Sequence, residues 1–572
     1  MNPGPSVADG SSGRVLTGAT ALLELEPIGI LEAAWIRAGG AGKERLGARR
    51  GGHVRSSLGA RRASLGPGRT RWLGPGLARD PVNGASEAAR PGALDRASRI
   101  REPAGVERGS ARAFGRDRRL AESPSTALPL RPASPVIASN PRRAVLAAGL
   151  RYPQARAGGR YTQEDPGHLA ASLSRELLAR TAVDPETIDE VIVGCVGPPH
   201  DQANVARVIG LRAGVPQSVP AYTVARNCAS GMQAVTSAVT AVEAGRGDLF
   251  LCVGVEVMSG YPLIMNDKAR DFFGGMASAR TPAAKAKAVA AFRPGMLAPR
   301  IAITEGLTDP ISGLLMGSTA ELLARDFGIS RTDCDDYALR SHVRAAGAIE
   351  SGRYERELVP YLPLGSGRKD ASLTSDDGVR ANQTPEALAK LRPYFEKPDG
   401  VVTVGNACGI TDGATALLIT SEERARDLGL TPLAAIRDFA WSGCDPARMG
   451  LGPVWATTKL LERTGIQLSD LDAIEVNEAF AAQVLACKMA FESDSYAMEH
   501  LGRNVAVGEL DLAKTNVNGG AIAVGHPVGA TGARLLLTTA HELSVRDGEL
   551  GLATLCIGGG QGGAVLLERI DR

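Results

Sequence analysis

The sequence predicts an α/β fold made of two similar halves with an inserted segment between them. From residue 141 onward, short β-rich runs alternate with helical patterns, as where residues 188–194 follow the helical stretch 168–180. Such alternation is typical of helices layered on a sheet. Residues 237–254 pass from a helix through a turn into Leu-Cys-Val-Gly, and residues 537–558 repeat this order and end in Leu-Cys-Ile-Gly. This recurrence predicts a duplicated α/β unit.

The first 140 residues differ in composition from the rest of the 572-residue chain. They contain 21 Arg, a single Lys and no Cys among many Gly, Ala, Pro and Ser residues, with a net charge of +10 against −7 for the remainder. Such a segment does not bury enough apolar surface to offset the entropy lost on ordering. We therefore expect a disordered, low-complexity extension rich in Arg, Gly and Ala. Its Arg-Gly patches lack the interleaved aromatic residues typical of RNA binding, so we expect no nucleic-acid partner.

The start of the chain and its hydropathy bear on where the protein works. After Met1 the next methionine is Met232, so we expect synthesis in the cell to begin near Val136 or Val145 from a non-methionine start codon. Three glutamates interrupt the apolar stretch 15–36, which makes it a poor export signal. No apolar run approaches the ~20 residues that cross a bilayer. We expect no membrane span and a cytoplasmic protein.

All eight cysteines lie after residue 140, at wide and irregular spacing. They form no CxxC pair and have no histidine nearby at the spacing of metal ligands, so we expect neither a metal site nor a disulfide framework. The pattern indicates a reducing compartment, in which most of these thiols pack as small apolar groups. A catalytic cysteine must then be recognised from its local setting.

The segment between the halves is rich in Ala, Lys and Arg, as in residues 277–287, and we expect a mostly irregular region that covers the site. One helix is predicted there, opening at Thr332 with Asp335 three residues on as a capping-box variant. His342 stands between two arginines of this helix and is expected to be a solvated surface residue. We expect five parts in chain order: the extension, 1–140; the first half, 141–257; the covering region, 258–410; the last strand of the first half, 411–423; and the second half, 424–572.

Cys228 stands where a β-type run gives way to a helix. The run ends at Asn227, small residues follow, and apolar residues from Met232 onward recur on one helical face. A thiol at a helix start faces unpaired N–H groups and the positive end of the helix dipole, which favour the thiolate and lower the thiol pKa from ~8.5 toward neutrality. The segment predicts a nucleophilic cysteine; an inert, packed cysteine is the alternative.

His526 is followed by Pro527, and proline favours the first position of a helix. We therefore expect His526 at the N-cap, where the helix dipole disfavours the imidazolium and keeps a neutral base available. If the two halves are related by a pseudo-twofold axis, the helices of Cys228 and His526 are counterparts whose N-termini point at one cleft. That arrangement pairs a nucleophile with a base. Taken by itself, a capping histidine is the alternative.

Two further segments carry polar groups at strand ends. Cys556 is followed by consecutive glycines, whose turn can pass close to a ligand and aim N–H groups at an oxyanion. This turn continues into a strand and not a helix, which argues against a dinucleotide site. Asn477 stands at the carboxyl end of a strand just before a helix, a usual place for a group that positions a ligand or water.

Four motifs in the same order resemble the thiolase family, the acyl-CoA acetyltransferases, over about residues 142–572. They are Asn-Cys228-Ala-Ser-Gly, Asn477-Glu-Ala-Phe, Gly-His526-Pro and Cys556-Ile-Gly-Gly-Gly-Gln-Gly. The resemblance implies a five-layered α-β-α-β-α fold of two duplicated halves with an inserted loop domain, assembled as a homodimer or homotetramer. It also implies coenzyme A and acyl-CoA as substrates, with no permanently bound cofactor.

By position, the resemblance implies a role for each motif. Cys228 takes the acyl group as a thioester, His526 activates it, and Cys556 acts as acid and base. Asn477, through a held water, and His526 form one oxyanion hole for the enolate. The backbone N–H groups of Cys228 and Gly558 form the other, for the acyl thioester. The implied reaction is cleavage of a 3-ketoacyl-CoA by CoA, or the reverse condensation, in a ping-pong scheme.

The resemblance also implies three substrate or CoA contacts, at Leu315, Met316 and Cys408. Leu315 stands where acetoacetyl-specific members often carry a histidine, and an apolar residue there favours longer acyl chains. Cys408 stands where relatives usually carry Ser or Thr against the pantetheine, and a thiol is the weaker donor. The long stretch 491–514 resembles the fatty-acid β-oxidation branch, for which a hydratase/dehydrogenase partner is expected.

Two alternatives stay open. A ketoacyl synthase shares the architecture and the nucleophilic cysteine, but it uses a second histidine or an asparagine where this chain has Cys556. A catalytically inactive member kept as a partner scaffold is the other alternative, and the four intact motifs argue against it.

Overall fold

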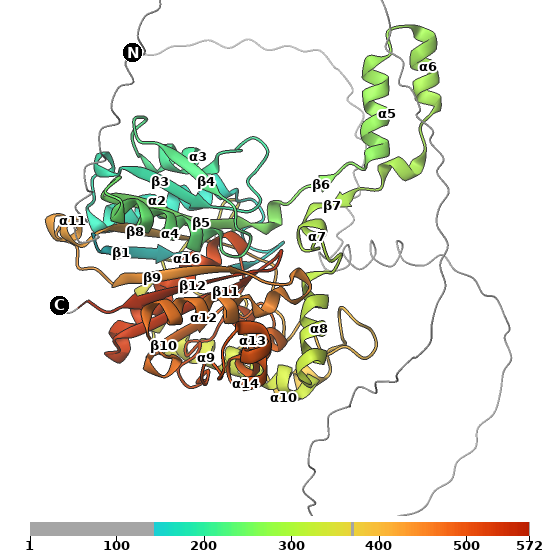
Figure 1. The fold of residues 1–572 in the computed structure, drawn as a ribbon. Helices are drawn as coiled ribbons and strands as arrows, with labels where there is room; N and C mark the ends of the chain where they lie inside the picture. The colour runs from blue at the N-terminus through green and yellow to red at the C-terminus, as the bar shows by residue number, and fades with distance from the viewer. Residues whose placement is uncertain (1–141, 368–370, 571–572) are drawn as a thin grey trace, which may run out of the picture. The chain divides into compact units, whose positions relative to one another are not determined.

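The computed structural model describes residues 142–367 and 371–570. The predicted disordered extension, 1–140, and the predicted translation start near Val136 lie outside the described residues. The described residues all belong to one compact unit, 136–572. Figure 1 shows its helices and strands.

In the first half, the strands lie side by side in the order β4-β3-β5-β8-β1. Strand β3 is parallel to both β4 and β5, whereas β8 is antiparallel to both β5 and β1. The short β2 pairs with β8. The elements of this half are β1 (Ala144–Arg151), β2 (Ala155–Arg156), α2 (Pro166–Thr181), β3 (Glu190–Gly194), α3 (Val205–Ala213), β4 (Ala221–Val224), α4 (Ser230–Glu243), β5 (Leu249–Val257), β8 (Thr411–Ser421) and α11 (Glu422–Asp427).

The second half repeats this pairing pattern. Strand β10 is parallel to β11, and β12 is antiparallel to both β11 and β9. The elements are β9 (Ala434–Gly443), α12 (Gly452–Thr464), β10 (Ala473–Val476), α13 (Ala481–Phe491), α14 (Asp494–Tyr496), α15 (Ala521–Val524), α16 (Val528–Arg546), β11 (Leu550–Ile557) and β12 (Gln561–Glu568).

An aspartate at the start of the parallel strand pair repeats in the two halves as well. Asp189 accepts the backbone N–H groups of Asp248 and Leu249, at 2.6 and 2.9 Å. Asp472 accepts those of the residues that open β11 in the same way. The predicted duplication is therefore confirmed in strand order, in strand direction and in this local contact.

The two halves stack as five layers. Helices α4 and α16 pack against each other between the two sets of strands, α2 and α3 cover the outer face of the first set, and α12 and α13 cover that of the second. Three apolar clusters fill the spaces between layers, and the middle one joins both halves. Strands β1 and β9 pair through Val145–Ala435 and Leu146–Ala434, which makes one hydrogen-bonded path of the two sets. The five-layered expectation is confirmed.

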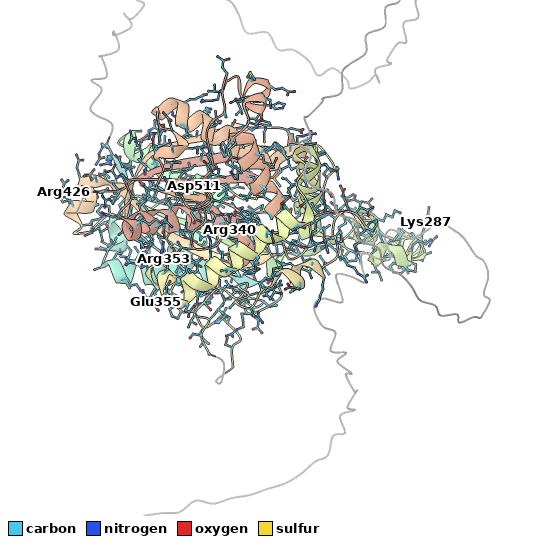
Figure 2. The ribbon with its side chains drawn as sticks, turned by 90° about the horizontal axis from the view of Figure 1, so that it is seen from below. Lys287, Arg340, Arg353, Glu355, Arg426 and Asp511 are labelled. Atoms are coloured by element: carbon cyan, nitrogen blue, oxygen red, sulfur yellow. The ribbon has the colours of Figure 1, made fainter. Side chains whose placement is uncertain are left out.

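The covering region is largely helical up to residue 350, where the expectation of a mostly irregular segment is wrong, whereas its described residues from 351 to 410 are mostly irregular, as expected. Residues 277–287, read as a loop, belong to a hairpin of two helices capped by Asn266 and Thr281. The region contains β6 (Leu263–Ile264), α5 (Asp267–Ser278), α6 (Pro282–Ala290), β7 (Arg300–Ile301), α7 (Ala302–Gly306), α8 (Met316–Phe327), α9 (Arg331–Glu350) and α10 (Pro385–Ala389). Most of the hairpin is exposed, and Lys287 on α6 lies far from the layers in Figure 2.

Helix α9 begins before the predicted position. Its capping box joins Ser330 and Asp333, each two residues before the predicted Thr332 and Asp335. His342 is buried, and the expectation of a surface residue is wrong, because the face of α9 that carries it packs on the body. Among the described residues, no helix is long and apolar enough to cross a membrane.

Candidate active site

The N-terminal ends of α4 and α16 meet because both helices carry glycine where they cross. A Cβ added at Gly231 would lie 2.7 Å from the carbonyl oxygen of Gly529, and one at Gly532 would lie 2.5 Å from the backbone nitrogen of Met232. Contacts this short leave no space for a side chain, so glycine permits the close approach. The first turn of each helix therefore lies beside that of the other, and the residues just before both helices come to one region.

Cys228 lies just before α4 and not within it. Strand β4 ends at Val224, earlier than the predicted end at Asn227, and the helix begins at Ser230. Asn227 has φ 42°, in the left-handed region, and its side-chain amide donates to the carbonyl oxygen of Gly558 at 2.7 Å. This contact ties the Cys228 loop to the turn after Cys556 in the other half.

The expected lowering of the Cys228 pKa is wrong. Burial raises the pKa of this thiol, whereas the backbone N–H groups of Gly558 and Cys228 itself act in the opposite direction. The charge of Glu256 raises it further. The helix-start groups predicted from sequence thus face the sulfur, but they are outweighed by the loss of water. Cys228 requires a base to become a thiolate at neutral pH.

His526 lies one residue before the N-cap of α16. Pro527 occupies the N-cap, so the prediction that His526 caps the helix is wrong by one residue. The backbone N–H of His526 donates to the hydroxyl oxygen of Thr411 on β8, at 2.7 Å. Burial, aided by the cation of Arg534, lowers the pKa of His526 to about 3. The predicted neutral base follows, although burial is the leading cause.

The neighbours of His526 define its tautomer. Its Nδ1 lies 2.7 Å from the hydroxyl oxygen of Thr531. That hydroxyl already donates its proton to the carbonyl oxygen of Pro527, at 3.0 Å, so it accepts the Nδ1 proton. The lone pair is then on Nε2, where the side-chain amide of Asn477 approaches at 3.4 Å. An unprotonated Nε2 is the form that a general base requires.

Asn477 follows β10 directly, and α13 begins four residues later, as expected for a residue at a strand end. Its backbone N–H donates to the carbonyl oxygen of Thr554 on β11, at 2.9 Å. The side chain is fully buried, and its Oδ1 has no hydrogen-bond partner within the described part of the chain. A buried acceptor of this kind can hold a water or a polar group of a ligand.

Cys556 is the next-to-last residue of β11, and Gly558, Gly559 and Gly560 form the turn into β12. Two of these glycines have φ near +80°, so the turn needs residues without a Cβ. Burial, followed by the neighbouring thiol of Cys228, raises the pKa of Cys556 well above its ordinary value. Cys556 is therefore protonated at neutral pH.

The predicted substrate contacts Met316 and Cys408 lie beside different catalytic segments. Leu315 is the N-cap of α8, and Met316 is its first residue. The sulfur of Met316 lies close to Gly558, since a Cβ added at Gly558 would be 3.3 Å from it. The backbone N–H of Cys408 donates to the carbonyl oxygen of Ala479, two residues after Asn477. Burial and the thiol of Cys228 raise the pKa of Cys408 to about 12. Met316 comes from the covering region, so this region contributes a side chain beside the turn at Gly558.

Sequence reasoning missed Thr411, Thr531 and Glu256, which hold the catalytic segments from behind. Thr531 could have been found, because it follows His526 by five residues, about one helical turn into α16. Thr411 and Glu256 are contributed by strands of the other half, and their contacts to the His526 segment depend on tertiary structure.

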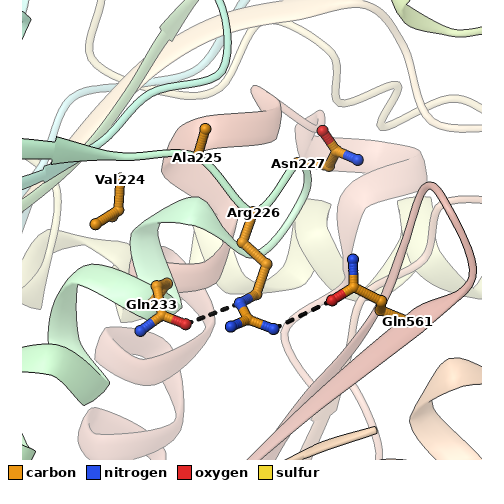
Figure 3. A pocket seen from close by; sticks show the side chains of 6 residues that line it. All are labelled: Val224, Ala225, Arg226, Asn227, Gln233 and Gln561. Atoms are coloured by element: carbon orange, nitrogen blue, oxygen red, sulfur yellow. Dashed lines mark hydrogen bonds between the residues drawn. The ribbon is translucent and has the colours of Figure 1, made fainter. Parts of the chain in front are cut away.

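A pocket of about 430 Å³ lies beside the Cys228 loop (Figure 3). Arg226 extends into it, donates to Gln233 at 2.8 Å and to Gln561 at 3.1 Å, and stacks over the ring of Trp441. The described lining residues include no side chain predicted to act in catalysis, so we assign no substrate to this pocket. They are Val224, Ala225, Arg226, Asn227, Gln233 and Gln561.

Two family models match this chain in succession. "Thiolase, N-terminal domain" matches residues 144–423, and "Thiolase, C-terminal domain" matches residues 430–569. The chain belongs to the thiolase family. As a thiolase it is an acyltransferase, and the recognition made from its four motifs is confirmed.

Similar proteins align with this thiolase over nearly their whole length. A 3-ketoacyl-CoA thiolase of Pectobacterium carotovorum is 40% identical over 436 residues, 76% of this chain and 98% of the relative. An acetyl-CoA acetyltransferase of Escherichia coli is 42% identical over 403 residues, 70% of this chain and 93% of the relative. Human mitochondrial 3-ketoacyl-CoA thiolase in complex with CoA matches with a TM-score of 0.65 at 35% identity, covering 75% of this chain and 98% of that one.

Proposed function

We propose that this thiolase cleaves 3-ketoacyl-CoA with CoA to give acyl-CoA and acetyl-CoA, and catalyses the reverse condensation, through a covalent acyl group on Cys228. The observation that carries the proposal is that the motifs are joined by hydrogen bonds across the two halves. Asn227, beside Cys228, donates to the carbonyl oxygen of Gly558, two residues after Cys556. Asn477 binds Thr554 on β11 through its backbone and contacts His526 through its side chain. A nucleophile, a neutral base, a protonated thiol and N–H donors are the groups that this reaction requires.

In the first half-reaction, Nε2 of His526 takes the proton of the Cys228 thiol, and the sulfur attacks the 3-keto carbon. The N–H groups of Cys228 and Gly558 donate hydrogen bonds to the negative oxygen that forms. The bond between C2 and C3 then breaks, and its electron pair goes to the enolate of acetyl-CoA. The protonated Nε2 and a water held by Asn477 stabilise that enolate. Cys556 gives its proton to C2, and acetyl-CoA leaves.

In the second half-reaction, the thiolate of Cys556 takes the proton of the CoA thiol. The CoA sulfur attacks the thioester on Cys228, and the Cys228 sulfur leaves and recovers its proton from His526. Both cysteines end as they began, so the scheme balances over one turnover. The raised pKa of Cys556 supports its part as the acid, because it keeps the proton available until the enolate forms.

We infer a preference for acyl chains longer than four carbons, with Leu315 and Met316 against the acyl group and Cys408 against the pantetheine. The apolar character of both covering residues supports this inference. We also propose a role in fatty-acid β-oxidation in the cytoplasm, with a hydratase/dehydrogenase partner, which the resemblance of the stretch 491–514 to that branch supports.

We also propose a homodimer or homotetramer. Strand β4 lies at one end of the described sheet, and Tyr222 on it is exposed. Exposed edges of this kind pair readily with a second copy.

The deciding experiment measures CoA-dependent thiolysis of acetoacetyl-CoA and 3-ketohexadecanoyl-CoA. We expect the wild type to cleave both, with the higher kcat/KM on the longer substrate, and Cys228→Ser to cleave neither. Cys252→Ser is the control, because that thiol is buried in the middle core and donates to the carbonyl oxygen of Ala234. Absence of thiolysis by the folded wild type would favour the inactive-scaffold alternative and refute the proposal.

A further inference from the structure

Glu256 is a buried carboxylate that joins three segments around the site. It lies on β5 and has no exposed surface. Its Oε1 accepts the backbone N–H of Gly197 at 2.9 Å and the hydroxyl of Tyr261 at 3.0 Å. Its Oε2 accepts the N–H groups of Val196 and Gly529, both at 3.0 Å. Burying a charged group is unfavourable unless it is hydrogen-bonded in this way, so the four contacts depend on one another.

The contact with Gly529 fixes the start of the helix that follows His526. Gly529 is the second residue of α16, and its N–H is one of the first-turn groups without a partner inside the helix. Pro527 at the N-cap has no polar side chain to serve it. Glu256 supplies the acceptor from the other half of the molecule, and a carboxylate at this end also complements the helix dipole.

The contacts with Val196 and Gly197 act on the side of Cys228. These residues follow β3, whose last residue, Gly194, lies directly against the start of α4. A Cβ at Gly194 would lie 2.2 to 2.4 Å from backbone atoms of Ser230 and Gly231. The segment that Glu256 holds is therefore continuous with the one that supports the Cys228 loop.

We propose that Glu256 is a positioning residue for the acyl-transfer reaction, which sets the separation of the Cys228 and His526 segments by binding both from behind. This inference rests on the roles proposed above for Cys228 and His526. Glu256 reacts with no substrate; it acts through Gly529 on one side and through residues 196 and 197 on the other. Its charge has a second, separable effect, since it opposes ionisation of the Cys228 thiol.

The test compares Glu256→Gln and Glu256→Asp with Asp189→Asn. Asp189 is the matched control, because it accepts two backbone N–H groups at the opposite end of the same strand, far from the catalytic residues. We expect kcat to fall 10- to 100-fold in both Glu256 variants with KM changed less than threefold. Asp189→Asn is expected to keep kcat within twofold.

Alkylation of Cys228 by iodoacetamide at a series of pH values gives a readout independent of turnover. Removing the charge in Glu256→Gln is expected to move the alkylation midpoint to lower pH, whereas Glu256→Asp keeps the charge and the midpoint. If Glu256→Gln lowers kcat while its Cys228 thiol ionises more easily, the loss of rate comes from lost positioning and not from a weaker nucleophile. The assay measures the ionisation of the Cys228 thiol directly, so it gives a result even if the wild type shows no thiolysis. Failure of the proposed function can therefore be told apart from failure of this inference.

Two results would overturn the inference. One is a kcat within twofold of the wild type in a folded Glu256→Gln or Glu256→Asp enzyme. The other is a fall in kcat matched by an equal fall in Asp189→Asn at the same thermal stability, which would assign the effect to general loosening of β5. If Glu256→Gln does not fold, Glu256→Asp alone decides by the same kcat criterion.

Discussion

At the scale of single residues, both ring nitrogens of His526 are assigned by neighbours. The Thr531 hydroxyl donates to Pro527 and so accepts from Nδ1, which leaves Nε2 free to take a proton. The backbone of His526 is held separately by Thr411. Proton chemistry at Nε2 therefore depends on one hydroxyl group, that of Thr531, which has no exposed surface.

Thr531→Val tests this dependence. Valine keeps the shape but leaves the Nδ1 proton without a buried acceptor, which costs ~1–3 kcal/mol and favours the wrong tautomer. If this cost is borne in the transition state, kcat falls about 10- to 100-fold. Thr531→Ser restores the hydroxyl and should recover most of the rate. Steady-state thiolysis measures both; equal rates for the Val and Ser variants would contradict the assignment.

His342 is the second residue whose environment sets its protonation. Burial, followed by the cations of Arg380 and Arg156, lowers its pKa to about 4, and its Nδ1 accepts the backbone N–H of Arg380. The ordinary value is about 6.5. A lowered pKa means that the unfolded chain binds the proton more tightly, so the stability contributed by neutral His342 is present above pH 6.5. It is lost as the pH falls from about 6.5 to about 4.

His342→Gln should therefore flatten the acid side of the stability profile. Between pH 7 and pH 5 the wild type is expected to lose about 2 kcal/mol more of its free energy of unfolding than the variant does. Buried His526 acts in the same direction in both proteins, and Glu475, with its pKa raised to about 7, acts in the opposite direction in both. Urea denaturation at the two pH values measures the difference, with the exposed His200→Gln as control. Parallel profiles for wild type and His342→Gln would refute it.

At the scale of elements, the site depends on how closely α4 and α16 cross. A methyl group at Gly231 would meet the carbonyl oxygen of Gly529 at 2.7 Å and the backbone nitrogen of Ala533 at 2.9 Å, both of them backbone atoms. The contact cannot relax by turning a side chain. The two helices must move apart, and the residues before them move with them.

Gly231→Ala is expected to lower stability by about 1–3 kcal/mol, as overpacking does, and to reduce kcat. The sign of the stability change is informative, because a Gly→Ala substitution inside a helix otherwise stabilises a protein by roughly 0.5–1 kcal/mol. Gly347→Ala in α9 is the matched control: a Cβ there has no atom within 4 Å, and this helix position is exposed. Thermal unfolding should show opposite shifts for the two variants. Shifts of the same sign would contradict close helix approach as the cause.

Sequence patterns predicted elements well where apolar periodicity was strong and poorly where it was weak. The helix–turn–strand repeat around Cys252 and Cys556 was predictable because both strands are continuous apolar runs. Residues 277–287 of the α5–α6 hairpin read as a loop because the Ala and Lys residues of α6 form no apolar face. Its caps, Asn266 and Thr281 followed by Pro282, were present in the sequence and mark both helix starts.

At the scale of the whole molecule, the sequence placed the reactive groups but not the groups that hold them. Cys228, Asn477, His526 and Cys556 stand in short motifs with local meaning. The contacts of Glu256 and Thr411 with the His526 segment join residues over 100 positions apart. No local pattern encodes such a pair, because each partner is chosen by the packing of one half on the other.

A buried ion network joins all three parts of the described chain. Arg151 on β1 binds Glu357 at 2.8 Å and Asp376 at 2.7 Å, both in the covering region. Glu357 in turn accepts the hydroxyl of Thr538 on α16. Arg151, Glu357 and Asp376 are almost without exposed surface. Burial acts to lower the pKa of the Arg151 guanidinium, but the two carboxylates outweigh it and raise that pKa, so the arginine keeps its charge.

Arg151→Met should therefore be among the most damaging changes outside the catalytic residues. It leaves Asp376 buried without its counter-charge and Glu357 with only the longer contact to Arg353, at 3.8 Å. Breaking a buried pair from one side costs about 3–5 kcal/mol. Arg180→Met removes the arginine of an exposed pair with Glu176 and should cost less than about 1 kcal/mol. Changing Glu357 and Asp376 to their amides in the Arg151→Met background should recover part of the loss, because the uncompensated charge is then gone. Chemical denaturation of the four proteins at one concentration decides the matter, and an Arg151→Met loss no larger than that of Arg180→Met would show that this network does not hold the three parts together.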